Sequence, residues 1–244
     1  RRGRSDFKFG DYVLQDRIGG AVFLARHALL DSTVALKILP RDLVRRGSAV
    51  SRLQLDAFFA ACVDHPHLIS VIDTGYHRGH CFVVMEYVPG LDLETRIDQH
   101  GTLDAPTATQ LVCEAACGLQ VAHEMQTVHG AIEPSRLLVD DMGHIKVTGM
   151  GMSKLHADLG TTDTVPLRTR GREFAAPEQM RARPETDVRS DIYSLGKTFC
   201  FMLSGKKTRG DGHRQPALPD LRHSIPEQID RVCRKMLASD PADR

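Results

Sequence analysis

Apolar and β-branched residues in the first third of the chain form short runs separated by turn residues. Such runs predict β-strands, at residues 12–14, 21–25, 33–39, 68–72 and 81–87. One longer stretch among them, around residues 48–63, predicts a single helix. The Val-Pro-Gly triplet at 88–90 then interrupts the pattern, as expected of a hinge.

Beyond this triplet, helical spacing dominates. Asp104 stands just before Pro106, and this order predicts a helix start because a carboxylate caps free N–H groups and proline suits a first turn. A stripe of apolar residues at helical spacing follows, at Leu111, Ala115, Leu119 and Ala122. We therefore expect a long helix with one buried face.

Two further elements complete the pattern. Residues 137–139 and 145–148 flank a polar turn and predict a short hairpin. Residues 191–204 predict a strongly apolar helix ended by Gly205. The expected fold class is α+β, with a β-rich lobe at 1–87 (basic tail 1–5), a hinge at 88–92 and a helical lobe at 93–244.

Composition narrows the functional classes. The net charge of +1 gives no argument for nucleic acid binding, and the twelve histidines include no metal-binding motif. None of the six cysteines forms C-x-x-C, and Cys113 and Cys117 are expected in the core. Since no apolar run approaches the ~20 residues of a membrane span, we expect a cytoplasmic protein, or the cytoplasmic domain of a larger, membrane-anchored one.

Residues 129–139 resemble the catalytic loop of a protein kinase, H-R-D-L-x-x-x-N. Other segments resemble further motifs of that family in the same order along the chain, at 34–37 (V-A-I-K), 84–88 (hinge strand), 176–178 (A-P-E), 190–196 and 240–244. The chain is similar to a protein kinase domain, most like the bacterial Ser/Thr kinases. The resemblance implies a bilobal fold, with a small β-rich lobe containing one helix and a larger helical lobe.

The resemblance also assigns structural roles. It implies that Asp191 holds the backbone of the catalytic loop that begins at His129. Glu178 and Arg244 match the family's buried ion pair in the larger lobe. Asp56 stands where the family has the helix Glu that pairs with the strand Lys, although Asp is one methylene shorter.

The family's nucleotide pocket maps onto a further set of positions. The strand Lys would contact the nucleotide phosphates, a small Ala on the same strand face would leave room for adenine, and the hinge would contribute backbone groups. The candidate pocket residues are Val22, Ala35, Lys37, Met85, Glu86, Val88 and Leu138.

The reactive positions of the family are replaced. Ala131 stands for the catalytic Asp, and Arg136 and Gly149 stand for the two metal-binding residues. Glu133 replaces the catalytic-loop Lys, and Gly130 replaces the Arg that grips a phosphorylated activation loop. Phosphoryl transfer depends on a positioned nucleophile and on metal ions, so we expect no catalytic residue and no metal site here.

The glycine-rich loop is also altered. The family pattern is G-x-G-x-x-G-x-V, whereas only Gly20 and Ala21 separate Gly19 from Val22, four residues fewer. A loop this short is not expected to cover nucleotide phosphates.

Together these replacements predict that the chain is not an enzyme but a pseudokinase, a binding, scaffolding or allosteric module that requires no cofactor. The expected partner is a protein, another kinase being one option, which contacts helix 48–63 or the segment 152–174; nucleic acid is not expected. One alternative is an ATP or ADP sensor without Mg²⁺, in which Lys37 and Arg136 supply the positive charge. In the opposing interpretation, Arg136 pairs with Glu133 and closes the site. Another alternative is a weakly active, atypical Ser/Thr kinase.

Overall fold

The computed structural model describes residues 7–39, 63–150, 173–181, 186–206 and 225–244. These residues form two compact units, which we describe separately. The first comprises 7–39, 63–64 and 69–88, and the second comprises 65–68 and the described residues from 89 onward. The predicted helix at 48–63, with Asp56, lies outside the described residues except for Val63.

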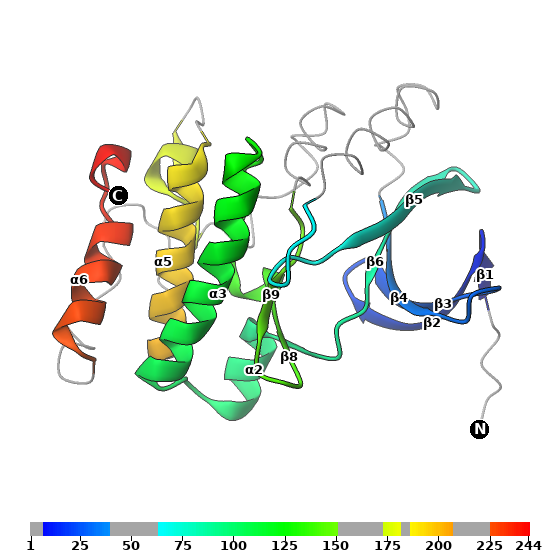
Figure 1. Ribbon diagram of the computed structural model, residues 1–244, viewed down its shortest axis with the longest axis horizontal. Coiled ribbons are helices and arrows are strands. Elements are labelled where there is room, and N and C mark those ends of the chain that lie inside the picture. Colours follow the sequence, from blue (N-terminus) through cyan, green and yellow to red (C-terminus); the bar gives the residue numbers. More distant parts are fainter. Residues whose placement is uncertain (1–6, 40–62, 151–172, 182–185, 207–224) are drawn as a thin grey trace. The chain divides into compact units, whose positions relative to one another are not determined.

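The first unit contains an antiparallel sheet of six strands in the order β1-β2-β3-β4-β6-β5 (Figure 1). The strands are β1 (Phe7–Phe9), β2 (Tyr12–Gly19), β3 (Val22–His27), β4 (Thr33–Ile38), β5 (Val71–His77) and β6 (His80–Glu86). The predicted strand at 68–72 is misplaced, because Leu68 forms only an isolated bridge with Val147 and the strand starts at Val71.

One face of this sheet carries the apolar core of the first unit. Val34 and Leu36 of β4 point into it and are nearly inaccessible to solvent. Their partners in the core are Phe9, Tyr12, Leu14, Ala25, Phe82 and Val84. Because side chains alternate along a strand, Ala35 and Lys37 lie on the opposite face of β4. The alternation of side chains along this strand therefore separates its core residues from its candidate site residues.

The second unit is mainly helical and includes a small sheet of order β7-β8-β9. Its strands are β7 (Gly90–Asp92), β8 (Leu137–Asp140) and β9 (Ile145–Val147). Its α-helices are α2 (Leu93–His100), α3 (Ala105–Glu124), α5 (Val188–Ser204) and α6 (Glu227–Met236). Short 3₁₀ turns are η2 (Pro134–Arg136), η3 (Pro177–Met180) and η5 (Pro241–Asp243). Helix α5 packs between α3 and α6 (Figure 1).

Local signals in the sequence account for the ends of the long helices. The Asp104 side chain accepts a hydrogen bond from Thr107 N at 2.8 Å, which caps the first turn of α3. Gly205 ends α5 in a left-handed conformation, and its N–H donates to the Phe201 carbonyl. The predicted start of α3, and the predicted start and end of α5, are thus confirmed to within a few residues.

The structure corrects the expectation for two cysteines. The predicted stripe of α3 is buried, but Cys113 and Cys117 are exposed. Cys113 follows Leu111 by two positions, about 200° around a helix, so it lies on the opposite face. The two cysteines do share one face, and it is the solvent-facing one.

The expected α+β class is confirmed by these two units, one built on a sheet and one on helices. Within the described parts of the chain, no helix has both the length and the apolar character needed to cross a membrane.

Candidate functional site

The loop that follows α3 is held by a buried carboxylate. Asp191, in the first turn of α5, is fully buried and accepts hydrogen bonds from His129 N at 2.8 Å and Gly130 N at 2.7 Å. The His123 Nε2 atom lies 2.8 Å from the same carboxylate. Such bonds to an ionised acceptor are stronger than neutral ones, so Asp191 fixes the start of the loop as the family resemblance implies.

His129 is a neutral residue in this arrangement. Its Nδ1 atom accepts a hydrogen bond from Ala131 N at 3.1 Å, which leaves Nε2 as the protonated nitrogen that donates to the Thr148 carbonyl at 3.1 Å. Burial lowers the pKa of His129 to about 4, because a charged imidazolium would lose its hydration. His129 therefore links the loop to the end of β9 without carrying charge.

Gly130 adopts a backbone conformation that favours glycine. Its φ angle is 71°, a value that side-chain-bearing residues rarely adopt. Its carbonyl accepts a hydrogen bond from Gln179 Nε2 at 2.9 Å, and Gln179 Oε1 accepts one from Ala176 N at 2.9 Å. Sequence analysis missed this bridging role of Gln179, because a glutamine after A-P-E carries no local signal for a contact made 49 residues away.

Arg136 extends beside the position where the family has its second metal ligand. A side chain at Gly149 would begin 2.8 Å from Arg136 Nη1 and 3.8 Å from His129 Nε2. Arg136 Nε lies 3.3 Å from Glu133 Oε1, and Ser135 Oγ donates to the same oxygen at 2.9 Å. The guanidinium thus fills the space at Gly149 and is paired with a carboxylate.

These residues do not fit a Mg²⁺ ion. The two positions that bind metal in the family hold a cation, Arg136, and a residue without a side chain, Gly149. Elsewhere in the described ranges, no group of three His, Cys, Asp or Glu side chains is arranged to hold a metal. Ala131 offers no atom that could accept a proton. We therefore derive no reaction step through a metal at this site.

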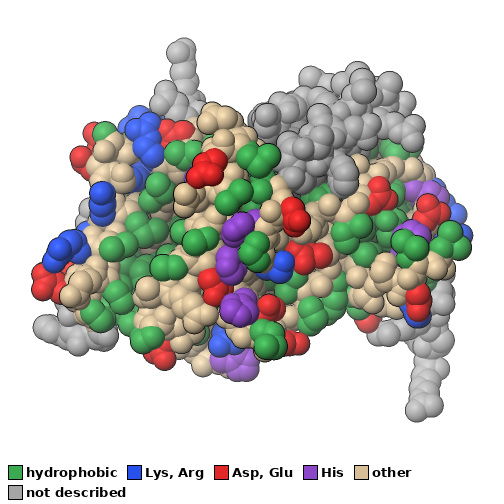
Figure 2. All heavy atoms as spheres, in the orientation of Figure 1, with side chains coloured by type: hydrophobic (Ala, Val, Ile, Leu, Met, Phe, Trp, Pro, Cys, Tyr) green, Lys and Arg blue, Asp and Glu red, His purple; other side chains and the backbone are tan. Residues whose placement is uncertain are grey.

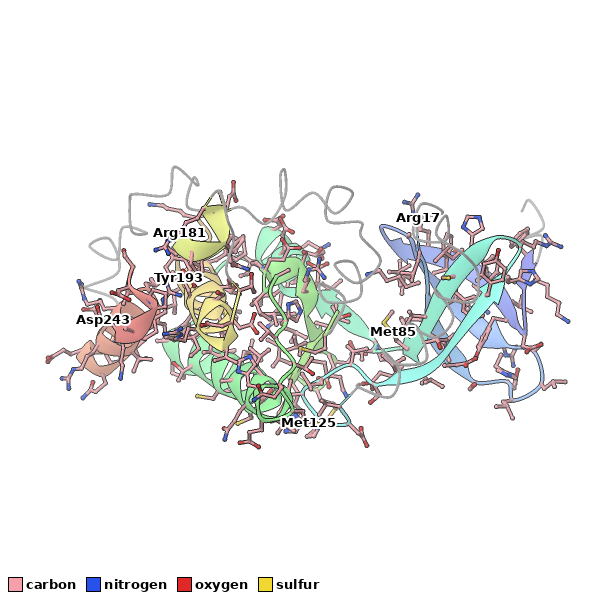
Figure 3. All side chains as sticks on the ribbon, turned by 90° about the horizontal axis from the view of Figure 1, so that it is seen from above. Arg17, Met85, Met125, Arg181, Tyr193 and Asp243 are labelled. Atoms are coloured by element: carbon pink, nitrogen blue, oxygen red, sulfur yellow. The ribbon has the colours of Figure 1, made fainter. Side chains whose placement is uncertain are left out.

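A buried ion pair braces the helical unit. Arg244 donates to Glu178 through Nη1 at 2.6 Å and Nη2 at 3.0 Å, and it stacks on Tyr193 with its Cζ 4.8 Å from the ring centroid. Figure 3 labels Tyr193 on α5 and Asp243, the residue before Arg244. Burial alone would raise the pKa of Glu178, but bonds from Arg244 and Ser190 lower it below its ordinary value.

Several candidate pocket residues lie on adjacent strands of the first unit. Val22 pairs with Lys37, and Ala35 pairs with Met85 (labelled in Figure 3). Glu86 is committed to a local contact, since its Oε1 atom accepts a hydrogen bond from Ser70 N at 2.8 Å. Lys37 and its neighbours among the candidates therefore lie on three adjacent strands of one sheet, β3, β4 and β6.

The remaining pocket candidates lie elsewhere. Val88 follows β6 at the end of the first unit, and Leu138 belongs to β8 of the second. The assignment of all these residues to a nucleotide pocket stays a prediction.

The shortened loop between β2 and β3 is a tight turn. Gly19 pairs with Val22 across the ladder, so only Gly20 and Ala21 lie between the last paired residues of the hairpin. The Arg17 side chain donates to the Gly20 carbonyl. This geometry leaves no extended segment that could fold over phosphates.

A cluster of histidines lies on the surface near α3 and β9 (Figure 2). Glu114 of α3 binds His144 Nδ1 at 3.0 Å and accepts Ile145 N at 2.9 Å, and His67 Nδ1 is 3.7 Å away. The hydrogen bond and charge of Glu114 raise the pKa of His144. These contacts tie the hairpin to α3, which gives the cluster a structural role.

Comparison with known proteins agrees with this architecture. Residues 18–244 match the protein kinase domain family, so the chain belongs to that family. In fold, the chain is similar to the crystal structure of the Mycobacterium tuberculosis PknI kinase domain. The match has a TM-score of 0.76 and 23% identity, and it covers 98% of this chain and 93% of that one.

Curated bacterial relatives are more similar in sequence. The serine/threonine-protein kinase PrkC of Bacillus subtilis is 32% identical over 96% of this chain. The serine/threonine-protein kinase PknB of Mycobacterium tuberculosis H37Rv is 30% identical over 91% of this chain. The chain spans 38% of the length of each of these two relatives.

These relatives contradict one expectation from the sequence. The replaced residues at 131, 136 and 149 predicted that the chain is not an enzyme. Proteins about 30% identical over most of the chain are named serine/threonine-protein kinases, which supports an enzyme instead. That prediction was wrong because it relied on single replaced positions, whereas the similarity to these kinases extends over nearly the whole chain.

Proposed function

We propose that this kinase-family domain has a regulatory role in which it binds a protein partner, with another protein kinase as the expected class of partner. The supporting observation is the pairing of Arg136 with Glu133 beside Gly149. The guanidinium takes up the space of a metal site, while Asp191 still holds the loop in place. A rigid loop with replaced reactive groups suits recognition. The near-neutral charge gives no support to nucleic acid as the partner, and the cytoplasm is the expected compartment.

A second candidate is a slow, atypical Ser/Thr protein kinase, and the names of the relatives favour it. Without a carboxylate at Ala131, transfer would lack a general-base contribution of roughly 10²–10⁴-fold in rate. It would also need charge neutralisation from protein cations rather than from Mg²⁺. Lys37, at the position of the family's phosphate-contacting Lys, and Arg136, at the position of a metal-binding residue, are the candidate cations.

Nucleotide binding without metal is compatible with either candidate. Arg136 is about a quarter exposed, so it retains access to an anion, but Glu133 neutralises part of its charge. We propose that ATP or ADP, if bound, binds weakly and without Mg²⁺. The Glu133→Gln variant should strengthen that binding, since it leaves the guanidinium without its anionic partner.

Two measurements on the purified chain separate the candidates. The first is the thermal shift with ATP or ADP, in Mg²⁺ and in EDTA; we expect any shift to be the same in both. The second is phosphoryl transfer from labelled ATP to the chain itself and to a peptide acceptor. A Mg²⁺-dependent rate of phosphoryl transfer that is lost in the Lys37→Met variant would reject the binding role and support the kinase role.

The binding role needs a positive test of its own. Titration calorimetry of the chain against other kinase domains from the same organism should find a saturable complex. The complex should persist when Ala131 is changed to Asp, since that position serves catalysis in the family. Absence of binding to every such domain would reject another kinase as the partner.

A further inference from the structure

Helices α5 and α6 approach each other very closely at one point. A Cβ atom placed on Gly196 of α5 would lie 2.8 Å from Met236 Cβ and 3.4 Å from Leu237 Cδ2. Real side chains do not tolerate the first of these distances, so Gly196 is what allows the backbones to come together. Residues one turn away on each helix are consequently brought within reach of one another.

Two thiols meet one turn from this contact. Cys200 follows Gly196 by about one helical turn, and Cys233 precedes Met236 by nearly one turn. The facing residues Gly196 and Met236 therefore form one layer of the α5–α6 interface, and Cys200 and Cys233 form the next. The two thiols interact directly, since each shifts the pKa of the other. Both side chains are buried, and they are free thiols. A disulfide requires the two Cα atoms to lie within about 7 Å of each other, and the contact at Gly196 draws this part of the two helices together.

The surroundings make the two thiols unequal. Interaction with the Cys233 thiol lowers the pKa of Cys200, and the nearby Lys197 ammonium lowers it further, against the effect of burial. Interaction with Cys200 and burial raise the pKa of Cys233, and the carboxylate of Asp230 raises it further. Lys197 is itself 7% exposed, so its charge acts within the interface. Cys200 is therefore the thiol that ionises and reacts first.

We propose that Cys200 and Cys233 form a redox modification site in which peroxide oxidation produces a disulfide that joins α5 to α6. In the first step, the Cys200 thiolate attacks one oxygen of hydrogen peroxide, the O–O bond breaks, and Cys200 becomes a sulfenic acid. The departing hydroxide takes the Cys233 proton and leaves as water. The Cys233 thiolate then attacks the Cys200 sulfur, the S–O bond breaks, and the released hydroxide is protonated by solvent to a second water.

The cross-link would change how the helical unit opens. Helix α6 is a ten-residue element, and its contacts with the rest of the described chain are mainly with α5. A covalent bond at Cys233 would prevent α6 from separating from α5 while the rest of the unit stays folded. Oxidation thus provides a way to stabilise this end of the domain without any change at Arg136 or Gly149.

The test uses the intact chain treated with hydrogen peroxide, beside a sample kept in dithiothreitol. Free thiols are then alkylated under denaturing conditions, and the peptides are mapped by mass spectrometry. We expect a peptide pair joined through Cys200 and Cys233, and a melting temperature higher by about 5 °C or more in the oxidised sample. Full alkylation of both cysteines after peroxide treatment would overturn the proposal, as would cross-links made only to other cysteines.

Two variants serve as matched controls. Cys113→Ser/Cys117→Ser removes the exposed pair on α3 and should leave both the cross-link and the melting shift unchanged. Cys233→Ser should lose the cross-link and the peroxide-dependent shift together. Should Cys233→Ser fail to fold, Cys200→Ala offers the same readout, and the mapping of the unaltered chain decides the question without either variant.

Discussion

Arg136 Nη1 lies 2.8 Å from the point where a side chain on Gly149 would begin. Both residues occupy positions that bind metal in the family, and the Arg136 side chain fills the space where a side chain of residue 149 would lie. A substitution at Gly149 is therefore expected to displace Arg136, and removal of the Arg136 side chain is expected to make room at residue 149.

Substitution of Gly149 tests this coupling. Gly149→Ala should lower the free energy of unfolding by about 2 kcal/mol, because alanine is strained at a φ of 91° and its methyl group displaces Arg136. Gly143→Ala is the matched control, since Gly143 has a φ of 85° and no neighbour within 4 Å. Urea denaturation of both variants, each also combined with Arg136→Ala, isolates the contact. Equal losses for the two alanines would argue against it.

Asp191 should be among the residues that the fold tolerates losing least. Asp191→Asn removes one acceptor oxygen and the negative charge from a buried site that receives His129 N and Gly130 N. We expect a loss of about 3 kcal/mol in the free energy of unfolding. Asp187→Asn at the exposed N-cap of the same helix should cost about 1 kcal/mol or less. Similar losses from both variants, measured by urea denaturation, would contradict the anchoring role.

The Glu178–Arg244 pair predicts a similar contrast between buried and exposed charges. Glu178→Gln leaves the guanidinium of Arg244, whose side chain is 0% exposed, without a charged partner. The expected cost is about 3 kcal/mol. Glu227→Gln removes the carboxylate from an exposed pair with Arg231 and should cost less than about 0.5 kcal/mol. Calorimetric melting of the two variants gives the comparison.

His129 should make stability fall in mild acid. Its pKa is about 4 in the folded chain and about 6.5 for an ordinary histidine, so the unfolded state binds an extra proton between these values. Its contribution is complete above the unfolded pKa and is lost as the pH falls through this window, by roughly 2 kcal/mol near pH 5. Denaturation curves of the unaltered chain and of His129→Gln should differ in this pH dependence. Parallel curves would mean that His129 titrates normally.

Much of the fold could be predicted from the sequence because its signals are local. The cap at Asp104 and the glycine at 205 mark the ends of long helices, and the apolar, β-branched run around Ala35 marks a strand. The strand β7 was missed because Gly90 resembles a breaker. Its glycine is in fact required, since a side chain there would collide with the Val139 carbonyl of the paired strand.

The candidate site could be predicted only in part. The replaced residues are visible in the sequence, but the contact between Arg136 and Gly149 depends on how η2 and the end of β9 pack. The link from Gln179 to Gly130 likewise joins segments far apart in the chain. Cys113 and Cys117 were wrongly placed in the core because small apolar residues were assumed to be buried, whereas the helical phase of Leu111 sets their face.

The turn at Gly20 and Ala21 has a mechanical consequence. A hairpin whose last paired residues are Gly19 and Val22 has only two residues at its tip, so the tip cannot move as a long flap. The ladder between β2 and β3 is interrupted farther from the tip, by register shifts between Leu14 and Arg17 and between Arg17 and Gly19, and bending of the hairpin is expected there. The rate at which a ligand leaves this sheet would therefore not be governed by the motion of a glycine loop.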